Sequence, residues 1–238
     1  MTWQVHADPI LWIAGLRALL LQAVHPAAMA GVLQHSDFRA DPWGRLRRTA
    51  DYVGVVTFGS DEEVARMGAR VRGIHRKVRG TDASTSITYR ADDPHLLRWV
   101  HCCEVESFVS TYQRATGALA PEEIDAYYAE QTRAAAVVGL DPADVPSSAA
   151  EIAEYFASMR AEAAVDRRAR RVASYVLLPP MPRWTRRLYG LPTPLGSDAT
   201  ATAALRGLHA AMRAAPDRYR EGPHLKAARE RLGLLATG

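Results

Sequence analysis

Two consecutive helix patterns between Asp41 and Gly80 constrain the fold of this chain more than any other feature. The second pattern has apolar residues at alternating steps of three and four, which is the spacing of a helix with one face in a core. These residues are Val64, Met67, Val71, Ile74 and Val78. Ser60, followed by three acidic residues, predicts where this helix begins, and Gly80 after a basic turn predicts where it ends. The chain must therefore supply a core for this stripe.

The first helix of the pair begins at Asp41, whose side chain can cap the free amides of the first turn. Arg45 and Thr49 are four residues apart and share one face of this helix. The same face continues through Tyr52 and Val56, so it changes from charged to apolar within about three turns. Such a face is suited to the wall of a buried site for an anionic ligand.

A single histidine, His75, lies on the border of the apolar stripe. It follows Val71 by four residues and precedes Val78 by three, so its ring is predicted to face the edge of the core. One interpretation is an ordinary core-edge histidine bonded to a carbonyl group. The other is a functional role, which depends on the residues around it.

The length and composition indicate one globular domain over residues 1–238. The chain is 48% hydrophobic and 24% charged, with a net charge of +4 and a pI near 9.3. The longest apolar run, Ile10 to Val24, is interrupted by Arg17 and is too short to cross a membrane. Many arginines fall at helix ends or on solvated faces, so nucleic-acid binding is not expected. The start lacks a basic signal-peptide region, and the expected location is the cytoplasm.

The rest of the chain predicts an all-α fold with at most one small β-hairpin. Helices are expected over 9–24, 26–34, 94 onwards, 121–139, 198–214 and 224–235, and a short extended segment over 85–89. A further long helix is expected from Ser148, with Arg167, Arg168, Arg170 and Arg171 at its end. These arginines form either a solvated face or a clamp for an anionic group.

Two other histidines are candidates for a site. His25 precedes Pro26, so it is expected at a kink, where it either caps the break or faces a ligand pocket. His101 and Glu104 share a helix face but do not predict a di-iron centre, because that needs Glu-x-x-His on two helices. The literal Glu221-x-x-His224 contains glycine and proline, which disfavour a helix there. His101 is expected first as a polar core residue or as a partner of a ligating group.

Several segments, in this order and spacing, resemble the haem protein family of latex clearing proteins (rubber oxygenases) and fungal mycophenolic-acid-pathway oxygenases. The densest segments are 23–32, 35–36, 41–49, 58–59 and 74–75, and the similarity continues through 89–94, 97–101, 155–160 and 177–182. The resemblance implies a mostly helical fold around one non-covalent haem b. It places His75 at the proximal iron ligand and Arg45 and Thr49 in the haem pocket.

One position departs from the family pattern. Rubber oxygenases carry a lysine before the motif threonine, whereas this chain has Arg48, which does not deprotonate usefully. A lysine-type sixth iron ligand is therefore excluded. Arg48 or Arg45 can instead meet a haem propionate. Covalent haem attachment is also excluded, because Cys102 and Cys103 are adjacent and no Cys-x-x-Cys-His motif is present.

We therefore expect an enzyme, a haem b-dependent oxygenase that uses O2 on a small apolar substrate. The expected catalytic residues are Arg45, Thr49 and His25, and the expected cofactor-binding residues are His75, Arg45, Arg48, Thr49 and His101. The expected apolar walls are Val53, Val56, Val71, Ile74, Val78 and Phe108.

Thr49 either donates to bound O2 or bonds back to the Arg45 carbonyl group. The alternatives are a non-catalytic haem-binding protein and, less favoured, a basic helical nucleic-acid binder. The oligomeric state is left open.

Overall fold

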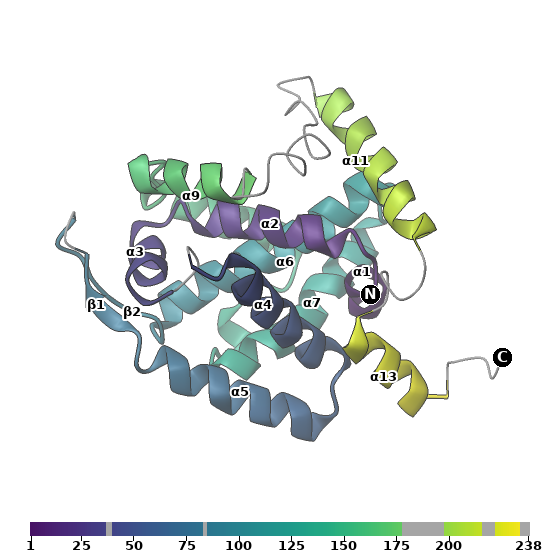
Figure 1. Ribbon diagram of the computed structural model, residues 1–238, viewed down its shortest axis with the longest axis horizontal. Coiled ribbons are helices and arrows are strands. Elements are labelled where there is room, and N and C mark those ends of the chain that lie inside the picture. Colours follow the sequence, from purple (N-terminus) through teal and green to yellow (C-terminus); the bar gives the residue numbers. More distant parts are fainter. Residues whose placement is uncertain (37–39, 83–84, 178–197, 216–221, 234–238) are drawn as a thin grey trace.

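The computed structural model describes residues 1–36, 40–82, 85–177, 198–215 and 222–233, and it is almost entirely helical (Figure 1). The α-helices are α1 Thr2–His6, α2 Leu11–Gln22, α3 Pro26–His35, α4 Pro42–Phe58, α5 Asp61–His75, α6 Pro94–Thr116, α7 Pro121–Val138, α8 Ala149–Ser158, α9 Arg167–Leu177, α11 Asp198–Ala214 and α13 Pro223–Arg231. Two 3-10 turns, η1 Pro142–Asp144 and η2 Met159–Ala161, and two strands, β1 Arg79–Thr81 and β2 Thr88–Arg90, complete the described elements. The all-α prediction with one small hairpin is confirmed.

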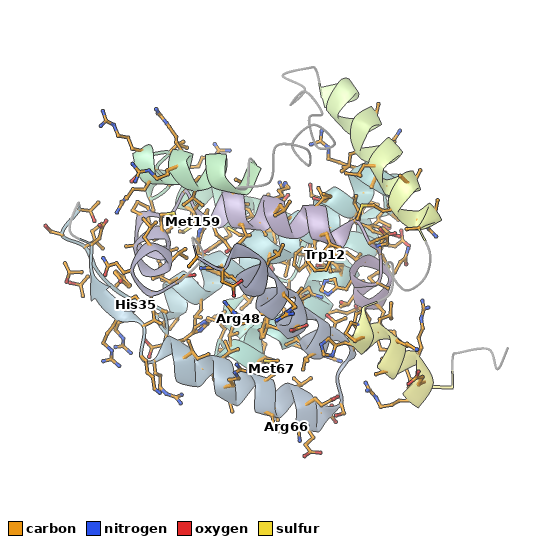
Figure 2. The ribbon with its side chains drawn as sticks, viewed as in Figure 1. Trp12, His35, Arg48, Arg66, Met67 and Met159 are labelled. Carbon is orange, nitrogen blue, oxygen red and sulfur yellow. The ribbon has the colours of Figure 1, made fainter. Side chains whose placement is uncertain are left out.

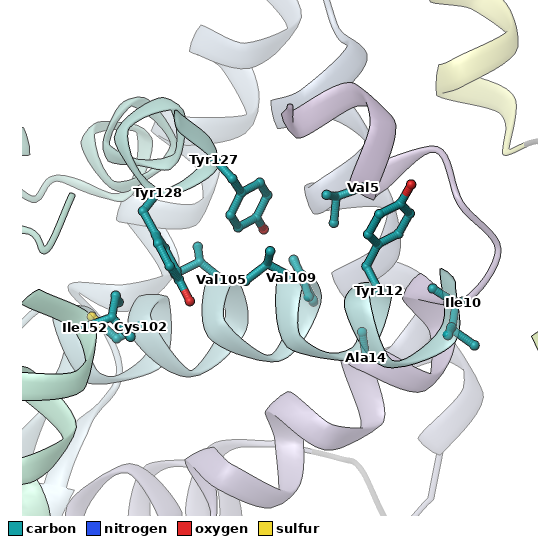
Figure 3. Packing of buried hydrophobic residues seen from close by; sticks show 12 residues of the cluster. Val5, Ile10, Ala14, Cys102, Val105, Val109, Tyr112, Tyr127, Tyr128 and Ile152 are labelled. Atoms are coloured by element: carbon teal, nitrogen blue, oxygen red, sulfur yellow. The ribbon is translucent and has the colours of Figure 1, made fainter. Parts of the chain in front are cut away.

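The long helix α6 passes through the middle of the molecule and packs along α2 (Figure 1). Asp93 begins α6 by accepting a 2.8 Å hydrogen bond from the His95 amide, and Pro94 occupies the first helical position, where no amide is needed. The main core cluster surrounds α6 (Figure 3). Its buried members are Val5, Ile10, Ala14, Cys102, Val105, Phe108, Val109, Tyr112, Ala115, Tyr127, Tyr128 and Ile152. The core is thus built from helices far apart in the sequence.

The helix pair read from the sequence forms as α4 and α5, which contact each other. Asp41 Oδ1 accepts from the Gly44 amide at 2.8 Å at the start of α4. At the start of α5, Ser60 Oγ accepts from the Glu63 amide and Glu63 Oε2 accepts from the Ser60 amide, a reciprocal capping box. Both predicted helix starts are confirmed.

The predicted end of α5 is wrong. The helix ends at His75, and Gly80 lies in strand β1, where it pairs with Tyr89 of β2. The reason is tertiary, because Tyr89 is buried and packs with Val78 against α3 and α6 residues. A Cβ atom on Gly80 would lie only 2.8 Å from the Tyr89 hydroxyl, so the glycine allows this close approach.

The helix predicted from Ser148 is also shorter than expected. It ends at Ser158, and the arginine-rich segment begins a separate helix, α9. Asp166 causes this restart, since its Oδ1 accepts 2.8 Å hydrogen bonds from the amides of Arg168 and Ala169. Arg168 in turn pairs with Asp82 at 2.7 Å, so this arginine ties α9 to the hairpin instead of forming a freely solvated face.

The N-terminal helix α1 was not predicted, and α2 begins two residues later than expected, at Leu11. The proline-rich segment that follows α9, with Trp184 and Tyr189, lies outside the described residues. No single described helix is long and apolar enough to cross a membrane. The pair α2 and α3 passes that test together, by length and composition only, with a bend of 109° between the two helices.

Candidate functional site

The residues singled out from the sequence come from α3, α4, α5 and α6. The structure places Arg45 and Thr49 on successive turns of α4, His75 at the last position of α5 and His101 in the second turn of α6. His25 precedes α3 and belongs to a different side-chain cluster, described below. Helix α4 contacts α5, and α3 contacts α6.

His75 is half-buried, and its Nδ1 atom is buried with no hydrogen-bond partner among the described residues. Burial lowers the pKa of this imidazole, and the charge of Asp92 opposes the shift. The ring is therefore neutral near pH 7, which is the form that ligates iron or another metal. A buried ring nitrogen without a partner is unusual in a purely structural histidine.

Arg45 is a partly buried cation beside α3. Its guanidinium donates a hydrogen bond to Ser36 Oγ, and no carboxylate among the described residues pairs with it. Burial, and to a smaller extent the nearby charge of Arg48, lower the pKa of this guanidinium. A desolvated cation is stabilised by an anion at the same place. The side chain is thus suited to a carboxylate of a ligand.

Arg48 lies on the same helix (Figure 2), but at its surface. Its side chain is 59% exposed and lies 3.3 Å from Asp41 Oδ2. Exposed pairs of this kind contribute about 0–1 kcal/mol to stability. Of the two arginines that the sequence offered for a propionate, Arg45 is the one in a partly buried setting.

The Thr49 hydroxyl donates a 3.2 Å hydrogen bond to the carbonyl oxygen of Arg45. This is the local bond that a helical threonine commonly makes. In this rotamer the oxygen can still accept a hydrogen bond, but its one proton is used. Donation to a ligand would require the hydroxyl proton to turn away from the backbone.

His101 is buried, and its Nε2 atom has no hydrogen-bond partner among the described residues. Burial lowers the pKa of the ring to about 4, so it is neutral under ordinary conditions. Arg98, one turn earlier, has a buried Nε atom that likewise lacks a described partner. This stretch of α6 therefore presents several polar groups to the interior.

The burial of the Glu104 carboxyl was not predicted from the sequence. Burial raises the pKa of its carboxyl to about 7, against the opposing effect of a hydrogen bond from Gln22. By exposed area Glu104 is only partly buried, but its carboxyl group is densely surrounded by protein atoms. Burial, and to a smaller extent the charge of Glu104, raise the pKa of Tyr52, which lies on the Arg45 face of α4. This electrostatic interaction links that face of α4 with the His101 face of α6. The three-residue step from His101 to Glu104 was the available sequence signal.

His25 caps α3. Its Nδ1 accepts from the Ala28 amide at 3.4 Å, and its ring lies against Trp99 with the centroids 5.7 Å apart. Burial lowers the pKa of this imidazole, partly offset by Glu162. Its Nε2 lies 3.4 Å from Glu162 Oε2, within ion-pair range but without a hydrogen bond. Both ring nitrogens thus have neighbours in this cluster, and the capping alternative describes the observed geometry.

A hollow of about 250 Å³ lies elsewhere, between α1, α6, α11 and α13. Its lining residues are Gln4, Ala7, Asp8, Pro9, Tyr112, Arg213, Leu225 and Arg229. None of these described lining residues is a histidine or one of the candidate residues. Most of the candidate residues lie on α4, α5 and α6, and we describe this region as the candidate site.

Residues 3–237 match the family described as "ER-bound oxygenase mpaB/B'/Rubber oxygenase, catalytic domain". The chain belongs to this family. The resemblance drawn from the sequence motifs is thereby confirmed, and the chain carries an oxygenase-family catalytic domain.

Two further relatives are proteins described as uncharacterised, one from Mycobacterium bovis and one from Mycobacterium tuberculosis. Each is 29% identical to this chain over 169 residues, which cover 68% of the chain and 66% of the relative. The match thus spans slightly less than two thirds of each relative's length. No solved structure matches the chain significantly.

Proposed function

We propose that residues 1–238 form a single domain that binds haem b and acts as an oxygenase on a small apolar substrate with O2. His75 is the proposed proximal iron ligand. Arg45 is the proposed partner of a haem propionate, Thr49 lies beside the reacting ligand, and His101 is a neutral group on the opposite wall. The membership in an oxygenase family supports the reaction class.

The observation that carries the proposal is the combination of a neutral His75 and a desolvated Arg45 on two helices in contact. A haem needs a neutral imidazole for its iron and a cation for its propionates. Among the described residues, His75 Nδ1 has no hydrogen-bond partner. The Arg45 guanidinium donates to Ser36 Oγ, but no described carboxylate pairs with it. The residues present therefore fit the group.

The apolar residues of α4 and α5 fit the porphyrin faces. Val56 and Val71 are only partly buried, and Ile74 is 50% exposed, although the helix faces read from the sequence predict core positions. Val53 is also partly buried, but it packs against the main core. Exposed apolar surface beside polar groups is typical of a ligand site. Phe108, by contrast, is buried in the main core, and Val78 packs on the hairpin.

Bound haem would supply the redox chemistry towards O2. The residues of the chain would orient and protect the reactants. Arg45 would fix one edge of the cofactor, and the valines would exclude water from its face. Glu104, whose pKa of about 7 leaves the acid and its anion both populated, would hold a proton in the same interior.

Haem content tests the proposal. The purified full chain should show a Soret band and contain up to one haem b per chain by the pyridine haemochrome assay. His75→Ala should lose most of this haem. His35→Ala, which removes an exposed histidine bonded to Tyr89, is the matched control and should retain it. Full haem with an unchanged spectrum in His75→Ala would contradict the ligand assignment and make His101 or His25 the next candidate.

The second candidate is a haem-binding protein without catalysis, for storage, sensing or transfer. The Thr49 bond to the Arg45 carbonyl favours it, because the hydroxyl proton is then not offered to a ligand. Consumption of O2 with an apolar substrate, in the absence of NADH, separates an oxygenase from this alternative.

A further inference from the structure

A second polar cluster lies outside the candidate haem site. His25 at the start of α3, His95 in the first turn of α6 and Glu162 just after η2 come together from three distant parts of the chain. One nitrogen or oxygen atom from each residue lies within 4.8 Å of those of the other two. His95 Nε2 is 2.8 Å from Glu162 Oε2, and His25 Nε2 is 3.4 Å from the same oxygen.

We propose that His25, His95 and Glu162 form a binding site for a divalent cation of the zinc class. Two imidazoles and one carboxylate are a common ligand set for zinc, with water in the fourth position. Zinc–ligand bonds of about 2.1 Å separate tetrahedral ligand atoms by roughly 3.4 Å. The observed separations require only small adjustments of the two exposed side chains.

The cluster combines a fixed ligand with two accessible ones. His25 is buried against Trp99, while the side chains of His95 and Glu162 are 45% and 47% exposed. A cation and its water can therefore reach the site from solvent. The segment of Glu162 is also fixed to the His25 region, because the Ala164 amide donates a 2.7 Å hydrogen bond to the Val24 carbonyl oxygen.

The charge state of the cluster suits a cation. Burial lowers the pKa of His25, which keeps the ring neutral, as a metal ligand must be. Burial alone would raise the pKa of Glu162, but the hydrogen bond and the charge interaction with His95, the largest opposing effects, contribute to a net lowering. The Asp93 carboxylate caps α6 at the His95 amide and offsets the positive end of that helix.

The hydrogen bond at His25 Nδ1 defines what metal binding must change. While Nδ1 accepts from the Ala28 amide, the neutral ring carries its proton on Nε2. A cation at Nε2 requires that proton to move to Nδ1 through solvent, so the ring keeps one proton and the 3.4 Å cap contact is lost. That contact is long and therefore weak, and a metal–nitrogen bond outweighs it.

Zinc titration of the untagged full chain by isothermal calorimetry, after treatment with a chelator, tests the site. We expect one Zn²⁺ per chain, and at least a tenfold weaker affinity in His95→Asn and in Glu162→Gln. Glu154→Gln, which changes an exposed carboxylate on α8, and His35→Asn are matched controls and should bind like the wild type. With Co²⁺ in place of Zn²⁺, the chelator-treated protein should show the intense visible bands of a tetrahedral cobalt site.

His75→Ala should bind Zn²⁺ normally, so this test is independent of the haem proposal. If the wild type binds no Zn²⁺, or if His95→Asn and Glu162→Gln bind it as tightly as the controls do, the metal site is refuted. The three residues would then form only a hydrogen-bonded link between α3, α6 and the segment after α8.

Discussion

At the scale of single residues, α4 shows how one helix separates two similar side chains. Arg45 and Arg48 are three residues apart, yet Arg45 bonds to Ser36 in a partly buried position, and Arg48 pairs with Asp41 at the surface. Burial lowers the pKa of the Arg45 guanidinium, whereas the Arg48 side chain is 59% exposed. A ligand carboxylate would therefore gain far more from Arg45 than from Arg48.

This difference gives a prediction about haem retention. Arg45→Ala should weaken haem affinity at least about tenfold, equivalent to roughly 1.4 kcal/mol, because a partly buried propionate would lose its cation. Arg48→Ala, on the same helix, should change affinity by less than about threefold. The equilibrium partition of haem between each protein and an apo-globin acceptor measures both affinities. Equal effects from the two variants would show that the propionates lie elsewhere.

At the scale of elements, α5 connects a strong N-terminal cap to the candidate iron ligand at its last residue. The capping box at Ser60 and Glu63 fixes where the helix begins. The hairpin fixes where the helix ends. The Val78 carbonyl oxygen accepts a hydrogen bond from the Ala91 amide, and the Val78 side chain packs against the cluster that contains Tyr89. His75 therefore sits at a helix end whose position is set from both sides.

Loss of this cap should lower stability without removing the ligand. Ser60→Ala deletes the side-chain bond to the Glu63 amide and should reduce the free energy of unfolding by about 1 kcal/mol. Ser158→Ala, at the exposed end of α8, should have little effect. Urea denaturation followed by circular dichroism measures both changes. An effect of Ser60→Ala no larger than that of Ser158→Ala would mean that the capping box contributes nothing measurable.

At the scale of the whole molecule, His6 joins α1 to the centre of the fold. Its Nδ1 lies 2.8 Å from Thr57 Oγ1 of α4 and its Nε2 lies 3.1 Å from the hydroxyl of Tyr127 of α7, while its ring packs edge-on against Phe108. Burial lowers the pKa of this histidine to about 3. The folded protein thus holds the ring neutral at pH values where an unfolded chain would protonate it.

The stability should therefore fall as the medium becomes acidic. A lowered folded-state pKa contributes stability that is present above the unfolded value of 6.5 and is lost as the pH falls towards 3. His101 acts in the same direction, and Glu104, with its raised pKa, acts in the opposite one. His6→Gln should reduce the loss of unfolding free energy between about pH 7 and 5 by roughly 2 kcal/mol.

Urea denaturation at the two pH values measures this difference. The contributions of the other titrating groups cancel in the comparison between the variant and the wild type. His35→Gln, which changes an exposed histidine, is the control and should leave the dependence on pH intact. A dependence in His6→Gln as steep as that of the wild type would contradict the role of His6.

The sequence by itself determined the helical class, most helix starts and the family. Caps and apolar spacing are local, so Asp41, Ser60 and Asp93 could be read as helix starts without any knowledge of their neighbours. The family motifs are likewise written along the chain, and they selected His75, Arg45 and Thr49 as candidates.

Only the tertiary structure decided where α5 ends and which polar groups meet. The end at His75 depends on Tyr89, and the restart at α9 depends on Asp166 together with Asp82. The carboxyl of Glu104 and the ring of His6 acquire shifted pKa values through burial by distant helices, which no local pattern records. The His25 cluster is the clearest case, because its members are separated by up to 137 residues (162 minus 25) and are brought together only by the packing of helices.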